Sequence, residues 1–152
     1  MAVHANIIAN EFITLAHQEN KQLTNMQLQK LVYIAQGYNL ALLNQCLYFN
    51  NTHAWQWGPV VPILYKKLQK YGSGIVVNLI NIQEDLISPI PAESKEIIGA
   101  VWSSYNSYTG GQLSSITHQN DSPWSVTWAE KRFSVIPIDR IAAHYLKKVQ
   151  KF

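Results

Sequence analysis

One short segment of this sequence combines the residue types that acid–base chemistry needs. In the segment HQNDSPW, His118 and Asp121 lie three residues apart, and a carboxylate at Asp121 could orient the His118 imidazole as a general base. The same segment suits a structural role equally well, because Asp121 or Ser122 can cap a helix whose first turn begins at Pro123. We expect the structural role, with His118 making a polar contact that holds this loop to the fold.

No other group of residues forms a convincing catalytic or metal site. Cys46 lies close to His53 in the chain, but a free cysteine usually packs as a small apolar side chain rather than acting as a nucleophile. No two histidines are four residues apart, and no CxxC motif is present, so metal-ligand spacing is missing. The sequence therefore predicts no catalytic residues, no metal and no cofactor. The five histidines are His4, His17, His53, His118 and His144.

The charge of the chain argues against nucleic-acid binding. Twelve Lys and Arg stand against nine Asp and Glu, which gives a net charge of only +3. The helix expected over residues 24–43 is too apolar, and too poor in Lys and Arg, to lie in a DNA groove. Because the basic residues occur in small clusters that suit solvated faces, a DNA-binding regulator remains only an alternative. These clusters are Lys66, Lys67 and Lys70, then Lys131 and Arg132, and last Arg140, Lys147, Lys148 and Lys151.

Aromatic and amide side chains take the place of the missing charges. Charged residues make up 14% of the chain, Asn and Gln occur twelve times each, and there are five Trp and eight Tyr. This composition excludes intrinsic disorder and a long coiled coil. Trp and Tyr are enriched at the centres of protein interfaces, and amides are desolvated at lower cost than charges. We therefore expect a protein partner, contacted through Tyr48, Trp55, Trp57, Tyr108 and Trp128.

The length and the termini favour one cytoplasmic domain. A chain of 152 residues is long enough to bury a full core as a single domain over 1–152. The single cysteine fits a reducing compartment, and the N-terminus lacks the pattern of a signal peptide. No apolar run approaches the roughly 18 residues that a membrane span requires, so no membrane partner is expected.

The periodicity of apolar residues predicts a mainly α fold of six or seven helices packed around a central helix at about 24–43. Thr24 and Gln27 form a capping-box pattern at the start of that helix, and its apolar residues surround most of its circumference. A small β hairpin or short strands are expected near 45–57, around Asn50–Asn51, and near 75–82. The other helices are expected at about 2–17, from Pro59 to Gly72, at 93–107, at 112–117, from Pro123 and from Pro137.

Three blocks of sequence resemble a known family. They are LTNMQLQKLVYIAQGYNLAL (23–42), AWQWGPVVPILYKKLQKYG (54–72) and LSSITHQNDSPW (113–124). In this order, they are similar to the conserved blocks of the SocA-like Panacea domain, which includes GepA-like phage-associated proteins. Each block alone is weak, whereas three in order are a fairly specific match that covers most of the chain.

This resemblance implies a non-enzymatic role. Panacea domains are antitoxins of bacterial and prophage toxin–antitoxin operons, and they neutralise diverse toxins by direct contact. One branch instead acts as an adaptor that delivers its toxin to a ClpXP-type protease, which stays open as an alternative. Because the family-wide positions serve unrelated toxins, we expect them to be structural. They match Gln29, Lys30, Tyr33, Gln36, Gly37, Gly58, Pro59, His118, Pro123 and Trp124 of this chain.

Overall fold

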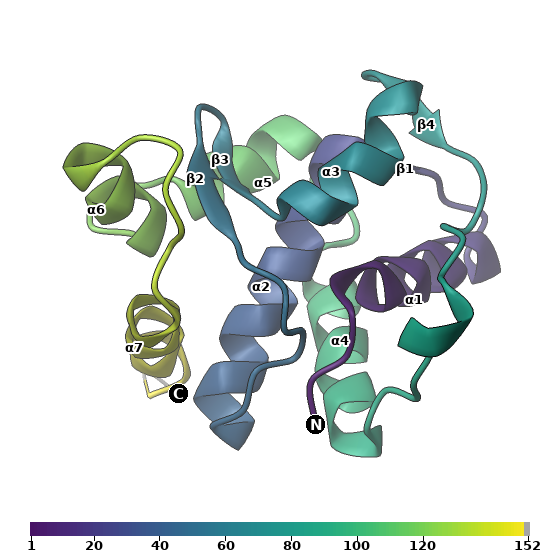
Figure 1. Cartoon of the computed structure of the whole chain (residues 1–152), viewed down its shortest axis with the longest axis horizontal. Helices are drawn as coiled ribbons and strands as arrows, with labels where there is room; N and C mark the ends of the chain where they lie inside the picture. Colours follow the sequence, from purple (N-terminus) through teal and green to yellow (C-terminus); the bar gives the residue numbers. More distant parts are fainter. Residues whose placement is uncertain (151–152) are drawn as a thin grey trace.

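The computed structural model describes residues 1–150, and it confirms the mainly α fold. Seven α-helices lie within these residues, and most of them pack around the second (Figure 1). Two pairs of very short strands and two 3-10 turns, η1 (Gln69–Tyr71) and η2 (Glu84–Leu86), connect the helices. The helices are α1 (Ala5–Gln18), α2 (Asn25–Leu43), α3 (Pro62–Leu68), α4 (Ala92–Tyr105), α5 (Gly110–Thr117), α6 (Pro123–Glu130) and α7 (Ile138–Val149).

Helix α2 is the central element, as its apolar circumference predicts. Its first turn is closed by the expected capping box: the Thr24 hydroxyl accepts from the Gln27 N–H at 3.2 Å, and the Gln27 side chain accepts from the Thr24 N–H at 2.9 Å. The helix ends at Asn44, whose left-handed backbone (φ 55°) stops further helical hydrogen bonding. Helices α1, α4, α5 and α7 pack around it, so most of its surface is buried (Figure 1).

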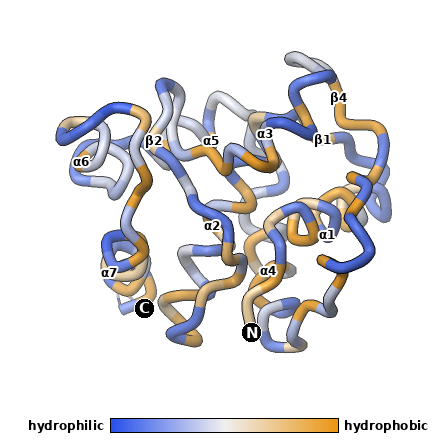
Figure 2. Tube along the Cα trace, in the orientation of Figure 1, coloured by the Kyte–Doolittle hydropathy of each residue, from blue (hydrophilic) through white to orange (hydrophobic). Residues whose placement is uncertain are grey.

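One cluster of buried apolar side chains joins these helices. Helix α1 contributes Phe12, α2 contributes Leu31, α4 contributes Ile98, and α7 contributes Ile141, all of them almost completely buried. Figure 2 shows apolar residues recurring among polar ones along α1, α4 and α7. Burial of this apolar surface is the main stabilising contribution to the fold, at about 25 cal/mol for each Å² removed from water.

The short strands differ in part from the expected pattern. Strand β2 (His53–Trp55) pairs antiparallel with β3 (Gly58–Val60), so the hairpin turns at residues 56–57 and not at Asn50–Asn51. Gly58 permits the tight return, because its φ of +116° is disfavoured for other residues. Pro59 consequently lies in a strand, and the following helix begins at Pro62.

A second strand pair fastens the region near 75–82 to the start of α2. Strand β4 (Ile75–Val76) pairs antiparallel with β1 (Leu23–Thr24). The sequence pattern of residues 75–82 indicates a strand but does not identify β1 as its partner. The two strands are each two residues long, so this pair restrains the entry of α2 rather than forming a sheet that covers a core.

The starts of α5 and α6 follow local capping. Thr109 forms a capping box with Gln112, so α5 includes the Gly110–Gly111 pair that was expected to lie before it. Ser122, and not Asp121, caps α6, because its hydroxyl accepts from the Ser125 N–H at 3.1 Å. None of the helices in the described part of the chain is long and apolar enough to cross a membrane.

Candidate functional site

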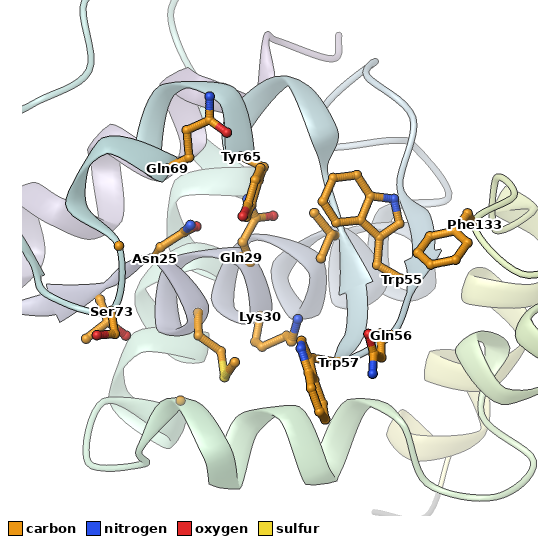
Figure 3. Close-up of a pocket in the computed structure, with 15 residues that line it drawn as sticks. Asn25, Gln29, Lys30, Trp55, Gln56, Trp57, Tyr65, Gln69, Ser73 and Phe133 are labelled. Carbon is orange, nitrogen blue, oxygen red and sulfur yellow. The ribbon is translucent and has the colours of Figure 1, made fainter.

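A groove of about 630 Å³ lies beside the N-terminal half of α2. The β2–β3 hairpin forms one wall, and α3 with η1 forms another (Figure 3). Gly110 at the start of α5 and Phe133 after α6 complete the boundary. Residues distant in the sequence therefore meet here, and the groove is the candidate site. Its central residues are Met26, Gln29, Lys30, Trp55, Trp57 and Tyr65.

The hairpin places two tryptophans in the wall of the groove. Trp57 lies in the turn, and its side chain is 63% exposed, although its carbonyl is held by the Ser114 hydroxyl. Trp55 packs edge-on against Tyr65, with ring centroids 5.2 Å apart, and its carbonyl accepts from the Trp124 indole N–H at 2.6 Å. The backbone of this wall is thus fixed by α5 and α6, while its indole rings face the groove (Figure 3).

Phe133 extends the same aromatic wall from the loop after α6. Its backbone has φ +64°, an uncommon conformation for a bulky residue that costs on the order of 1 kcal/mol or more. The Phe133 N–H donates to Ala54 at 2.9 Å, which holds the loop against β2 while the ring stays 56% exposed. Trp128 contacts the ring edge-on at 5.2 Å, and the Arg132 guanidinium lies 5.2 Å from the Trp128 ring centre. Sequence patterns gave no indication of Phe133 as a site residue.

Lys30 is the charged residue of the groove. Its side chain is only 1% exposed, and its Nζ donates to the Pro59 carbonyl at 2.9 Å. A Cβ at position 58 would lie 3.2 Å from Lys30 Cε, so Gly58 makes room for this side chain as well as for the turn. Burial lowers the pKa of the Lys30 ammonium to about 7, because the protein does not replace the hydration of the charge.

The lowered pKa gives a testable dependence of stability on pH. In the unfolded chain Lys30 titrates near 10.5, so above about pH 7 the unfolded state holds more protons than the folded state, and stability rises with pH. From pH 6 to pH 8 this contribution is about 1 kcal/mol in favour of folding. We expect urea unfolding to show this rise for the wild-type protein relative to Lys30→Met. Equal pH dependence of the two proteins would show that Lys30 stays fully charged in the fold.

The side-chain amides of Gln29 and Gln36 in α2 are hydrogen-bonded to backbone groups of the connecting loops. Gln29 pairs with Val61, whose N–H donates to the Gln29 Oε1 at 2.9 Å. Gln36 is completely buried and accepts from the Leu47 N–H at 2.6 Å. Tyr33 is buried as well, and Gly37 lies against the Tyr145 ring. The family-signature positions of α2 thus lie inside the fold, and the amides among them hold the connecting segments.

The residues predicted to contact a partner separate into two groups. Trp55 and Trp57 line the groove, and Trp128 stacks on Trp124 with ring centroids 5.5 Å apart, next to Phe133. Tyr108 forms the second group. It is exposed beside the start of α2, where its carbonyl accepts a hydrogen bond from the Gln27 side-chain amide.

Tyr48 does not belong to this surface. Its side chain is 0% exposed, and its hydroxyl is hydrogen-bonded to Thr52 at 2.6 Å. A ring in this position has no surface to offer a partner, which corrects the expectation for Tyr48. The residue follows Leu47, a core side chain, in a segment that pairs with Val3.

The residues that were considered for catalysis, His118 with Asp121 and Cys46 with His53, make structural contacts. The His118 Nδ1 lies 3.3 Å from the Ser114 hydroxyl, and the imidazole packs edge-on against Trp124 at 5.2 Å. Asp121, at φ +67°, precedes the cap of α6. Burial raises the pKa of the Cys46 thiol, which lowers its reactivity as a nucleophile at neutral pH. Over residues 1–150, no three His, Cys, Asp or Glu side chains come together in a way that could hold a metal ion.

Comparison with known proteins supports the family resemblance of the three sequence blocks at 23–42, 54–72 and 113–124. The sequence profile of the antitoxin SocA-like, Panacea domain matches residues 28–125, so the chain belongs to this family of antitoxin-like proteins. The chain is also similar to Antitoxin SocA of Caulobacter vibrioides (strain NA1000 / CB15N), with 28% identity over 133 residues. The matched region covers 82% of this chain and 70% of that relative. No solved structure matches the chain.

Proposed function

We propose that this protein is a cytoplasmic antitoxin that binds and neutralises a cognate protein toxin encoded in the same operon. The observation that carries the proposal is the family match over residues 28–125, which spans most of α2, the hairpin and the start of α6. The similar protein of Caulobacter vibrioides is itself named an antitoxin. A toxin is therefore the partner that the family supports best.

The groove and its aromatic wall support a role in protein contact. Trp57 and Phe133 are large apolar side chains that remain exposed although the fold has a well-packed core beside them. Large exposed aromatic groups gathered at one place are typical of interaction sites. We propose that Trp55, Trp57 and Trp128 contact the toxin, and that Tyr108 contributes at the edge of the same surface.

The contacts of the polar groups support a non-catalytic role. An acid–base site needs an imidazole and a carboxylate within hydrogen-bond reach of each other. The recorded contacts of His118 are with Ser114 and Trp124, and both of these residues belong to the packing around the hairpin. We propose that the protein acts by binding alone.

The proposal is tested by expressing the open reading frame next to this one, alone and together with this protein. We expect the neighbouring gene alone to reduce growth by several orders of magnitude in colony counts, and coexpression to restore growth. The two proteins should also copurify as a complex of fixed stoichiometry. A neighbouring gene that is harmless alone, or a toxicity that this protein leaves unchanged, would contradict the antitoxin function.

The same experiment in a strain that lacks ClpXP separates direct neutralisation from delivery to a protease. A protein that blocks its toxin by contact restores growth in both strains, and the amount of toxin stays constant. An adaptor restores growth only when the protease is present, and the toxin then disappears from immunoblots. We expect the first result.

A further inference from the structure

A second groove lies between helices α2 and α4, which run next to each other in the fold (Figure 1). It has a volume of about 640 Å³ and is lined by residues 38–43 of α2 and residues 93–105 of α4; we call it the α2–α4 groove. Leu42, on the α2 wall, is 56% exposed, and Ala100, on the α4 wall, is exposed as well. Accessible apolar side chains beside a groove are typical of an interaction site.

Two glutamates give one end of the α2–α4 groove a negative charge. Glu93 and Glu96 both line it, and both are exposed to solvent. Within the described chain neither has an ion-pair partner, since the recorded ion pairs join other residues. Over residues 1–150, no Lys or Arg is among the side chains that line this groove. The two carboxylates are therefore accessible and unmatched.

The stability of α4 explains only part of this charge. Glu93 lies in the first turn of α4, where a carboxylate interacts favourably with the helix N-terminus, but this effect falls off before Glu96. The Ser94 hydroxyl donates to the Asn39 side chain at 2.8 Å, so the start of α4 lies beside the last turns of α2. The C-terminus of α2 carries a partial negative charge at this same end. A cation is the group that this end of the groove favours.

The two walls favour a helix as the occupant. The backbone groups in the middle of α2 and α4 are hydrogen-bonded within each helix, so they cannot pair with an extended segment. A helix satisfies its own backbone and needs only side-chain contacts to bind in such a groove. Between Glu93 and Ser104, α4 rises by roughly 16 Å, which is the length of about three helical turns.

We propose that the α2–α4 groove receives an amphipathic helix of the partner protein, with apolar side chains at i, i+4 and i+7 facing the groove and a Lys or Arg beside Glu96. This inference rests on the proposed antitoxin function and names the chemistry of the toxin segment that is recognised. The apolar side chains gain free energy by leaving water, and the basic residue pairs with a carboxylate that it can reach.

The other end of the groove leads to a residue that we have assigned to toxin contact. Tyr105 lines the groove, and its ring packs edge-on against exposed Tyr108, with ring centroids 5.5 Å apart. The Tyr105 hydroxyl lies 3.5 Å from that of Tyr38, and burial raises the pKa of Tyr105, so this end is polar and uncharged. A toxin helix that binds in the groove would thus continue into the contact at Tyr108.

A second copy of this chain is another source of a basic helix. Helix α7 carries Lys147 and Lys148 next to Leu146, which is 43% exposed. Each copy has a net charge of +3, however, and this charge disfavours self-association. We therefore expect the purified protein to be monomeric in sedimentation. A dimer that the substitution Glu96→Lys dissociates would overturn the proposal of a toxin helix.

The charge requirement is tested with Glu96→Lys, and Glu84→Lys is the matched control. Both substitutions reverse the charge of an exposed glutamate, but Glu84 lies in η2, outside the groove. Against the purified product of the neighbouring gene, we expect roughly tenfold weaker binding for Glu96→Lys and unchanged binding for Glu84→Lys. The difference should decrease between 0.1 and 1 M salt, where the Debye length shortens from about 10 to about 3 Å.

The apolar contact is tested with Leu42→Ala, and Leu79→Ala is its control, because both leucines are 56% exposed and Leu79 lies outside the groove. We expect about tenfold weaker binding for Leu42→Ala alone, since less apolar surface leaves water on binding. If either groove variant binds as tightly as its control, the inference fails while the antitoxin function stands. If the wild-type protein binds no neighbouring product at all, both proposals fail together.

The identity of the bound segment is determined by photocrosslinking. A benzophenone amino acid in place of Leu42 should crosslink to one toxin peptide that has apolar residues at helical spacing and a Lys or Arg on the same face. The same group in place of Leu79 should give no crosslink. A crosslinked peptide that is acidic, or crosslinks from position 79 alone, would overturn the inference.

Discussion

Replacing Gly37 by alanine is expected to destabilise the protein by about 3 kcal/mol, or about 6–12 °C in Tm. Gly37 lies in the middle of α2, where α7 crosses, and a Cβ there would overlap ring carbons of Tyr145. The Tyr145 ring is buried and is held edge-on by Tyr38 and Tyr33, so it has little room to move. Overpacking at this contact therefore outweighs the roughly 1 kcal/mol that alanine contributes as a better helix former.

Gly99→Ala is the control for this substitution, because Gly99 also lies inside a helix, α4, but a Cβ there meets nothing within 4 Å. We expect this variant to be more stable than the wild-type protein by about 0.5–1 kcal/mol. Combining Gly37→Ala with Tyr145→Ala should remove most of the cost of the first change, which a double-mutant cycle measures. A Gly37→Ala variant that unfolds like Gly99→Ala would show that α7 does not press on α2.

The helices and the approximate places of two short strands follow from local sequence patterns, whereas the position of the hairpin turn and the pairing of the strands do not. The Thr24–Gln27 capping box and the apolar circumference of residues 24–43 suffice to place α2 and to make it central. The hairpin was expected around Asn50–Asn51, because these residues favour turns, but the chain turns at 56–57 instead. The reason is tertiary: the carbonyls of Trp55 and Trp57 are bound by Trp124 and Ser114, which lie about sixty residues away in the sequence.

The candidate site was predictable only in part for the same reason. Trp55 and Trp57 are recognisable as surface candidates, because their residue type is enriched at interfaces. Tyr48 has the same residue type, yet it is buried through contacts that no local pattern specifies. The unpaired burial of Lys30 and the left-handed backbone of Phe133 depend on how the loops close over α2. The sequence therefore indicates which residue types are available, and the packing decides which of them reach the groove.

Replacing Gln36 by methionine is expected to destabilise the protein by about 4 kcal/mol. The Gln36 amide serves three backbone groups of the buried segment after α2: it accepts from the N–H groups of Leu47 (2.6 Å) and Tyr48 (3.3 Å) and donates to the Tyr48 carbonyl (3.1 Å). Methionine keeps the unbranched shape but offers none of these bonds, and each buried group left unpaired costs about 1–3 kcal/mol.

The positions of the destabilised residues distinguish the loss of the Gln36 hydrogen bonds from a general loss of packing. The backbone around Leu47 also pairs with Val3, so the entry to α1 depends on the same segment. Hydrogen exchange should therefore quicken first at the amides of Val3, Leu47 and Tyr48, before the centre of α2 is affected. Gln112→Met, at an exposed capping box, should cost only about 1 kcal/mol and change exchange at the start of α5 alone. If Gln36→Met costs no more than Gln112→Met, water must replace the amide, and the loop after α2 is held by its apolar side chains rather than by Gln36.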